Sequence, residues 1–312
     1  MGSRNAHRSP AASQAGAGVE ESPHGYRIDR PALMAGPWDK RPPGRPPHTQ
    51  APRPPRAAAR GPAPAAAPRS EVRLYGQNAV DAVFRRRPEA IRKVYLAEAR
   101  IAALKPLLAW CVKQRVGYRV VADDDLDRLA GSSHHEGVVA DVLKAEPVGL
   151  SDWLRDLPAD GPALAIWLDG VSNPHNFGAI LRSAAHFGVA GLLLPRDSGL
   201  ALSGAAARVA EGGAEHVPLV RLGQADNALA QLRGAGFALV ATVVRGGDDL
   251  FAAPLPPRLV YVMGAEGEGM DVGLAAACDA RLSIPGTGAV ESLNVAAATA
   301  VLLAQWRMRA GY

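Results

Sequence analysis

From residue 163 onward, short apolar runs alternate with helical segments in a regular order. The runs at 163–168, 191–194, 237–243 and 259–263 are apolar at almost every position, which is typical of strands that are covered on both faces. Helical patterns fit the segments between them, so the sequence predicts an α/β fold with a parallel sheet. Because ligands of such sheets bind beyond the carboxyl ends of the strands, we expect a functional site in the loops at that edge.

The residues before this sheet divide into three parts. Residues 1–70 are rich in Pro, Ala, Arg and Gly without hydrophobic periodicity, which predicts a disordered tail. Residues 71–145 alternate strands and helices and are predicted to form a small α/β domain. Residues 146–162 hold several Pro and Gly residues, and we interpret them as an interdomain connection with one short helix near Trp153. The larger domain then spans residues 163–312.

The positive charge of the chain is concentrated in the tail. The 312 residues carry a net charge of +5, but residues 1–70 hold 11 Lys or Arg and 4 Asp or Glu, which leaves 24 basic and 26 acidic residues elsewhere. The tail is therefore either an electrostatic tether to RNA phosphates or a solvated linker. Its many prolines disfavour the amphipathic helix of a mitochondrial transit peptide. A second basic cluster, Arg85 to Arg87 with Arg92 and Lys93, either faces RNA or is ordinary solvated surface.

Several classes of protein and site are excluded by what the sequence lacks. No apolar run approaches the roughly 18 residues of a membrane span, and no apolar core of a secretory signal is present. Cys111 and Cys278 lie in different predicted units, so we expect two free, buried thiols in a reducing, cytoplasmic compartment. His134 and His135 have no further ligand at zinc spacing, so no metal site is predicted; a polar loop over nucleic acid fits them better.

Two of the loops at the sheet edge carry candidate functional residues. The loop after 163–168 leads into a helix that Asn176 is expected to cap. Arg182 follows in an otherwise apolar stretch, so it must reach solvent or meet an anion. The second loop, Gly264 to Gly269, follows a strand but has neither the dinucleotide fingerprint nor the phosphate-binding P-loop pattern.

The third loop lies within the stretch Arg281 to Met308. It begins with a short strand near Leu282 and passes through a Gly-rich turn to an Ala-rich helix, for which Ser292 is the expected N-cap. That helix is apolar on nearly every face, so it should be buried or packed on a partner.

These loops read NPHNFGAILRSAAHFG, VYVMGAEGEGM and LSIPGTGAVESLNVAAATAVLLAQW, and together they resemble the SpoU/TrmH family of RNA 2′-O-ribose methyltransferases of the SPOUT superfamily. The resemblance covers residues 71–312. The earlier segments LYGQNAV and SHHEGVVA look like that family's L30e-like RNA-binding domain. The long basic tail is similar to that of a bacterial subgroup described as tRNA/rRNA methyltransferases.

The resemblance implies a carboxyl-terminal trefoil knot, S-adenosylmethionine as cofactor without a metal, and a homodimer formed through the knot helices. The implied reaction methylates a ribose 2′-hydroxyl of RNA. Ribosomal RNA is favoured over transfer RNA because the L30e-like domain accompanies relatives that act on ribosomal RNA. The alternative is a non-catalytic RNA-binding paralogue that acts in ribosome assembly.

The resemblance also implies which residues form the site. Arg182 is expected to grip the target phosphate and stabilise the forming alkoxide, because a guanidinium is a poor base. Asn176, Glu266 and Asn294 are expected to hold Arg182 and the ribose in place. Matching the motifs residue by residue gives Asn176, Arg182, Glu266, Ser292 and Asn294 as catalytic residues and Gly264, Ile284 and Leu293 as cofactor-binding residues.

Overall fold

The apolar runs in the second half of the chain form one large parallel sheet. The computed structural model describes residues 70–267 and 269–310. Within them, eight strands pair in the order β10-β12-β9-β11-β6-β7-β8-β5, and every pair is parallel. The strands are β5 (Val148–Gly149), β6 (Ala163–Leu168), β7 (Gly191–Leu194), β8 (Leu219–Arg221), β9 (Ala238–Thr242), β10 (Asp248–Asp249), β11 (Arg258–Met263) and β12 (Ala280–Ser283). The predicted α/β fold with a parallel sheet is therefore confirmed.

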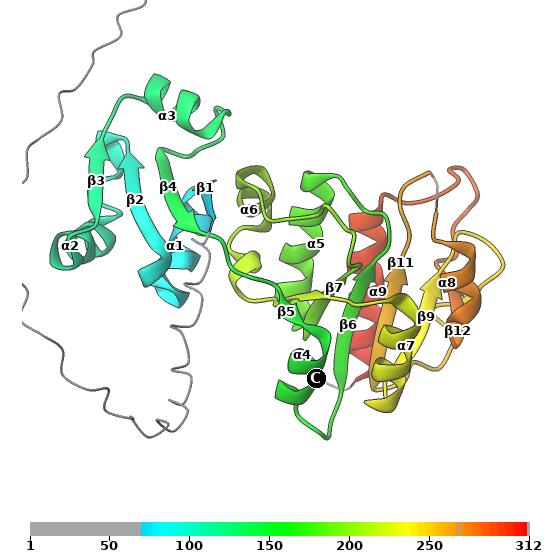
Figure 1. Ribbon diagram of the computed structural model, residues 1–312. Coiled ribbons are helices and arrows are strands. Elements are labelled where there is room, and N and C mark those ends of the chain that lie inside the picture. The colour runs from blue at the N-terminus through cyan, green and yellow to red at the C-terminus, as the bar shows by residue number, and fades with distance from the viewer. Residues whose placement is uncertain (1–69, 268, 311–312) are drawn as a thin grey trace, which may run out of the picture. The chain divides into compact units, whose positions relative to one another are not determined.

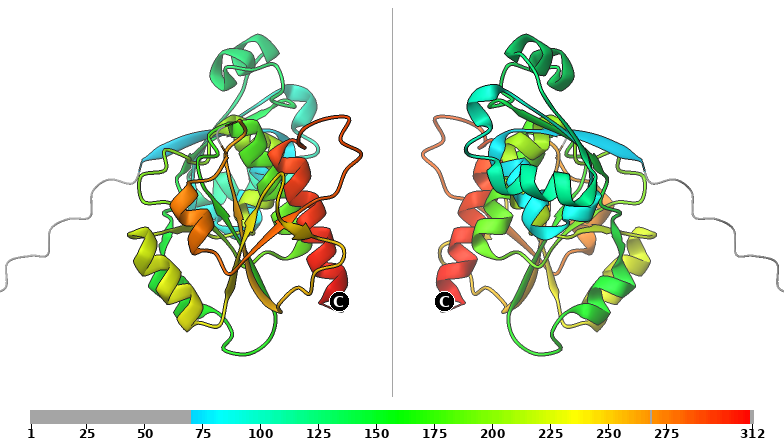
Figure 2. Two further views of the ribbon diagram at one scale, coloured as in Figure 1. Left: turned by 90° about the vertical axis from the view of Figure 1, so that its right-hand side faces the viewer. Right: turned by 90° about the vertical axis from the view of Figure 1, so that its left-hand side faces the viewer.

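Helices cover both faces of this sheet (Figures 1 and 2). The even-numbered residues of β6 lie in one hydrophobic core and the odd-numbered residues in another, as the two-residue period of a strand requires. The first core is covered by α5 (Pro174–Phe187), α6 (Gly204–Ala210) and α9 (Val295–Arg309). The second is covered by α4 (Leu150–Asp156), α7 (Ala225–Gly234) and α8 (Val272–Ala277). A run that is apolar at every position therefore fits a strand with a core on each side.

Residues 71–143 form a second, smaller sheet. Its strands lie in the order β1-β4-β2-β3, with β4 antiparallel to both neighbours and β3 parallel to β2. Its elements are β1 (Glu71–Tyr75), α1 (Gln77–Arg86), β2 (Ile91–Leu96), α2 (Lys105–Gln114), β3 (Gly117–Val120), α3 (Asp123–Ala130) and β4 (Val138–Leu143). We call residues 71–143 the leading module and residues 148–310 the main module; both lie within one compact unit of the chain.

Helix α6 joins the two modules. Ala206 and Ala210 lie in the first core of the main module, whereas Ala207 lies in the core of the leading module. The backbone of α6 also lies close to that of β1, since a Cβ at Gly204 would lie 2.6 Å from the carbonyl oxygen of Arg73. Small residues on α6 therefore allow β1 and α1 to pack directly on the main module.

The expected connection at 146–162 is folded onto the main sheet. It contains β5, which pairs with β8, and the predicted helix around Trp153, which is α4. Trp153 is buried and donates its indole N–H to the carbonyl oxygen of Ala190 at 2.9 Å. Leu150 and Trp153 are three residues apart, which places both on the buried face of α4.

Other predictions have mixed outcomes. Cys111 and Cys278 are both free, and burial raises the pKa of each thiol to about 11. Cys278 is only partly buried, so the expectation of full burial was wrong for that residue. The predicted disordered tail lies outside the described residues except for Ser70, and the trefoil knot stays a prediction.

Close packing between α5 and α6 gives a direct test of this fold. A Cβ at Gly178 would lie 2.8 Å from the Cβ of Val209 and closer still to the carbonyl oxygen of Ala206. We expect Gly178→Ala to lower the free energy of unfolding by about 1–3 kcal/mol, because the added methyl overpacks the contact. Gly234 is also helical but has open space around it, so Gly234→Ala should be neutral or stabilising by up to about 1 kcal/mol. Urea unfolding of both variants measures the difference, and equal effects would contradict the packing.

Candidate functional site

The loops that follow β6 and β11 meet at one edge of the main sheet. The backbone N–H of Asp271 donates to the carboxylate of Asp169 at 3.0 Å, which ties the end of one loop to the start of the other. Gly170 also lies against Ala265, since a Cβ at Gly170 would be 3.0 Å from the Cβ of Ala265. The two strands are neighbours in the sheet, so their carboxyl ends lie side by side, as expected from the sequence.

The start of α5 is capped by Asn173. Its side-chain oxygen accepts hydrogen bonds from the backbone N–H groups of His175 at 2.8 Å and Asn176 at 3.3 Å. The prediction that Asn176 is the cap was therefore wrong: it lies inside the first turn, after Pro174 at the first helical position. This frees the side chain of Asn176 for a contact outside the helix.

The start of α9 is capped by Asn294. Its side-chain oxygen accepts from the backbone N–H groups of Ala296 at 2.9 Å and Ala297 at 3.3 Å. Ser292, which was predicted to be the cap, lies two residues before this position on an exposed loop. The helix begins later than predicted because the Asn294 side chain satisfies the free N–H groups of the first turn.

Three predicted site residues meet where these segments converge. Asn294 uses its amide nitrogen to donate to Asn176 at 3.0 Å and to Glu266 at 2.7 Å. Glu266 also accepts from the backbone N–H of Val295 at 3.1 Å, so its carboxylate lies at the N-terminus of α9. We call Asn176, Glu266 and Asn294 the loop cluster. It lies largely at the surface, where its polar groups are accessible to a ligand.

The predicted cofactor residues lie on the segments that follow β11 and β12. Gly264 begins a tight loop in which Ala265 and Gly269 exchange backbone hydrogen bonds of 2.8 and 3.0 Å. A side chain at Gly264 would collide with the backbone of Gly269, so only glycine fits there. Ile284 is partly buried against the first core, and Leu293 is 47% exposed. These segments therefore offer backbone groups, one exposed apolar side chain and one partly buried apolar side chain.

Arg182 lies apart from the loop cluster. It is six residues after Asn176, which turns a helix by roughly 600° and places the two side chains about 120° apart around α5. Its guanidinium forms an ion pair with Glu211 at 4.0 Å, and its side chain is 64% exposed. The expectation that Asn176, Glu266 and Asn294 hold Arg182 is therefore wrong for contacts within one chain.

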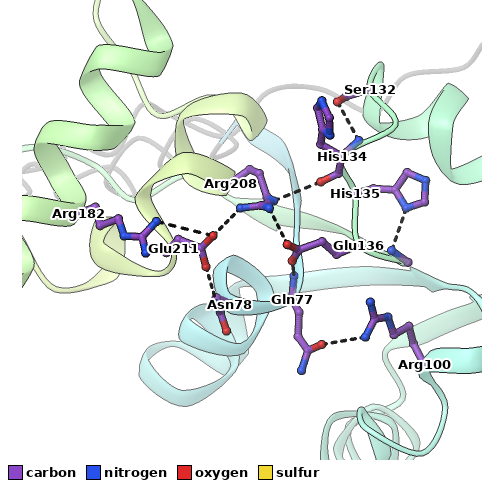
Figure 3. Close-up of polar contacts among 11 residues, drawn as sticks. Gln77, Asn78, Arg100, Ser132, His134, His135, Glu136, Arg182, Arg208 and Glu211 are labelled. Carbon is purple, nitrogen blue, oxygen red and sulfur yellow. Dashed lines mark hydrogen bonds and ion pairs between the residues drawn. The ribbon is translucent and has the colours of Figure 1, made fainter. Parts of the chain in front are cut away.

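Arg182 instead borders a cavity of about 530 Å³ on the other side of α5. Residues of α1, α5 and the segment after α6 line this cavity, among them Asn78, Arg85, His186, Glu211 and His216. Figure 3 shows Arg182 on α5 facing Glu211, with Asn78 of the leading module on the far side of the carboxylate. The cavity thus lies where the leading module meets the main module.

The structural roles of Glu136 and Glu211 were not predicted from the sequence. Both have positive φ angles, 54° and 51°, and each precedes a glycine that also has positive φ. Such angles are uncommon for residues other than glycine, so a Glu-Gly pair between two elements is the only sequence signal that these residues offered. A hydrogen bond from Asn78 lowers the pKa of Glu211, with ion pairs to Arg208 and Arg182 acting in the same direction against burial.

The basic cluster of the leading module has more than one role. Arg87 forms a two-pronged ion pair with Glu215, with distances of 2.6 and 2.8 Å, and Arg86 contacts His216 at 2.6 Å. These two side chains therefore join the modules rather than standing free as solvated surface. Arg85 faces the cavity beside Arg182.

Within residues 70–267 and 269–310, no three His, Cys, Asp or Glu side chains are arranged to hold a metal ion. No helix in this part of the chain is long and apolar enough to cross a membrane. His135, from the motif considered for a metal, is buried and accepts a hydrogen bond from the backbone N–H of Gly137 at 2.9 Å.

The chain is similar to known proteins along both modules. The SpoU rRNA Methylase family model matches residues 163–304, and the model for RNA 2′-O ribose methyltransferase substrate binding matches residues 73–148. A protein named uncharacterized tRNA/rRNA methyltransferase YfiF from Escherichia coli O157:H7 is 40% identical over 236 residues, which cover 76% of this chain and 68% of that protein. The 23S rRNA (guanosine-2′-O-)-methyltransferase RlmB of Escherichia coli K12 is 37% identical over 233 residues, covering 74% and 95%.

A solved structure has the same fold. The SpoU methyltransferase AviRb from Streptomyces viridochromogenes, in complex with the cofactor AdoMet, aligns with a TM-score of 0.63 and 24% identity, covering 77% of this chain and 90% of that one. At this identity the likeness shows the fold.

The capping geometry of α9 can be tested by two neighbouring substitutions. Asn294→Ala removes the cap and the hydrogen bonds to Asn176 and Glu266, so we expect the free energy of unfolding to fall by about 1–2 kcal/mol. Ser292→Ala should change it by less than about 0.5 kcal/mol, because that residue is exposed and outside the helix. Chemical denaturation followed by circular dichroism compares them. If Ser292→Ala lowered the free energy of unfolding more than Asn294→Ala, the N-cap of α9 would be Ser292, as the sequence predicted.

Proposed function

The chain belongs to the SpoU rRNA Methylase family, and we propose that it transfers the methyl group of S-adenosylmethionine to a ribose 2′-hydroxyl of RNA. The loop cluster is the observation that carries the proposal. It joins three loops that are far apart in sequence, at the edge of a parallel sheet where ligands bind. These are the loops whose motifs define the family in this sequence.

The loops suit the proposed cofactor. S-adenosylmethionine supplies, when bound, a methyl group on a positively charged sulfur, which is an activated electrophile. Leu293 and Ile284 offer apolar surface for an adenine ring, and the Gly264 loop offers backbone hydrogen-bonding groups. The carboxylate of Glu266 adds a negative charge beside this surface, which favours a cationic ligand.

Asn176, Glu266 and Asn294 then act by holding the loops and the ribose. Their mutual hydrogen bonds fix the directions of the polar groups before substrate arrives, which lowers the cost of alignment. Ser292 lies on the exposed loop that leads into α9, where its hydroxyl can meet the substrate.

Arg182 acts on the RNA. Its guanidinium remains charged, so it serves as a phosphate ligand and stabilises negative charge that develops on the attacking oxygen. The exposed side chain at the cavity is accessible to an RNA backbone. The catalytic roles of Asn176, Arg182, Glu266, Ser292 and Asn294, and the cofactor roles of Gly264, Ile284 and Leu293, are part of this proposal.

The leading module is the part that we assign to RNA recognition, with the main module as the catalytic part. Ribosomal RNA is the favoured substrate class, since RlmB is named as a 23S rRNA methyltransferase and YfiF as a tRNA/rRNA methyltransferase. We place the enzyme in the cytoplasm, where both kinds of RNA are found. Transfer RNA is the alternative substrate.

We further propose a homodimer formed through α9. One face of this helix packs on α5, but Ala297, Ala304 and Met308 form an exposed stripe along the opposite face. Met308 is 67% exposed, and exposed apolar stripes on a helix favour association. Within one chain, Arg182 does not contact the loop cluster. In a dimer, Arg182 of one copy could instead approach the loop cluster of the other copy.

A methyl-transfer assay tests the proposed function. Purified protein, radiolabelled S-adenosylmethionine and either ribosomal or transfer RNA should yield labelled RNA whose methyl group lies on a ribose 2′-oxygen. We expect Arg182→Ala to lower the rate by roughly 100-fold or more while calorimetry shows unchanged cofactor binding. Arg196→Ala removes another exposed arginine and should leave the rate unchanged. A folded wild-type protein that binds RNA but neither binds nor uses the cofactor would support the non-catalytic paralogue.

The proposed dimer has its own test. Ala304→Glu introduces a charge at the centre of the exposed stripe of α9 and should convert dimer to monomer in sedimentation analysis, because burying an unpaired charge is costly. Val112→Glu adds the same charge at an exposed apolar position of α2 and serves as the control. A wild-type protein that sediments as a monomer at micromolar concentration would rule the dimer out.

A further inference from the structure

Glu211 lies between the two modules and contacts Arg182. It follows the last residue of α6 and caps that helix in the left-handed conformation, with φ of 51°. One carboxylate oxygen accepts a hydrogen bond from Asn78 of α1 at 2.5 Å. The other oxygen accepts from Arg208 at 2.5 Å and lies 4.0 Å from the guanidinium of Arg182. A single carboxylate thus contacts α1, α5 and α6 (Figure 3).

Arg208 extends this contact to the loop before β4. Its guanidinium pairs with Glu136 at 2.6 Å, and Glu136 accepts the backbone N–H of Gln77 at 2.8 Å. Figure 3 shows the row of charges from Arg182 through Glu211 and Arg208 to Glu136. Three of its four members are partly buried, whereas Arg182 at its end is largely exposed. The exposed end of the row is therefore the part that is free to meet RNA.

The contacts of Glu211 with Asn78 and Arg208 are stronger than its contact with Arg182. Glu211 holds an unfavourable backbone conformation and two short hydrogen bonds, so its carboxylate is fixed in position. The 4.0 Å contact to an exposed Arg182 is weak, as most surface ion pairs are. Such a contact favours one orientation of the Arg182 side chain. The other N–H groups of the guanidinium can still donate to a phosphate.

We propose that Glu211 is a positioning residue, which directs the guanidinium of Arg182 toward the RNA and links that direction to the seating of the leading module. This inference rests on the proposed function, because it assigns Arg182 a role in methyl transfer. Glu211 itself is assigned no contact with RNA or cofactor. It acts by restricting the conformations of Arg182 before the reaction, so less conformational entropy is lost at the transition state.

Glu211→Gln is the decisive variant, since it removes the negative charge and keeps the size of the side chain. We expect kcat for RNA methylation to fall about 5- to 10-fold while KM for RNA changes less than about 2-fold, because an interaction needed at the transition state is weakened. The reaction of Arg182 with 4-hydroxyphenylglyoxal, followed by peptide mass spectrometry without RNA, should become at least about 3-fold faster, because loss of the ion pair leaves the guanidinium more accessible to the reagent.

Glu215→Gln is the matched control. Glu215 also joins the modules, through its ion pair with Arg87, but it has no contact with Arg182. This variant should lower the thermal midpoint while leaving the labelling rate of Arg182 as in the wild type. If Glu211→Gln alters neither kcat nor labelling, or if Glu215→Gln alters the labelling equally, the positioning role is refuted. A wild-type protein without methyl-transfer activity would overturn the proposed function alone, because the labelling still measures the effect of Glu211 on Arg182.

Discussion

The side chain of Asn294 holds together three segments that are far apart in the chain. Its oxygen caps α9, and its nitrogen donates to Asn176 on α5 and to Glu266 on the loop after β11. A carboxamide is suited to this position because it presents an acceptor and two donors in one plane. Neither aspartate, which has no donor when ionised, nor serine, which has a single donor, makes the same set of contacts. The geometry of the candidate site therefore depends on this residue more than on any other in the loop cluster.

Helix α5 connects this cluster to the remainder of the molecule. Its first turn meets Asn294, its middle packs closely on α6 through Gly178, and Arg182 faces Glu211. These contacts lie on different faces of one rigid rod, so their relative positions are set by the period of the helix. A displacement of α6 would act on Arg182 through Glu211, whereas a change in the loop after β11 would act on Asn176 through Asn294.

The sequence predicted the sheet and the convergence of the loop cluster, but not the use made of each polar side chain. The central strands of the main module were predictable because they are apolar at almost every position, and the loop cluster because its loops follow strand ends. The caps of α5 and α9 were assigned to the wrong residues, since Asn173 and Asn176, or Ser292 and Asn294, are equally able to cap. Short strands such as β8, at Leu219–Arg221, carry too few residues to show a period. The partners of Arg182 and Glu211 depend on how α1 packs on α6, which no local pattern encodes.

The separation of Arg182 from the loop cluster has a mechanical consequence. The loops around Gly264 and Leu293 are tied to α9 and to the first turn of α5, so ordering them around a cofactor leaves the contacts of Arg182 with Glu211 in place. Arg182, in turn, is linked through Glu211 to Asn78 of the leading module and to Arg208, which pairs with Glu136 of the same module. In the proposed function, cofactor and RNA therefore act on different parts of α5, namely its first turn and the turn that carries Arg182. Because both parts belong to one helix, the two binding events can be independent in energy while the bound cofactor and RNA stay aligned in space.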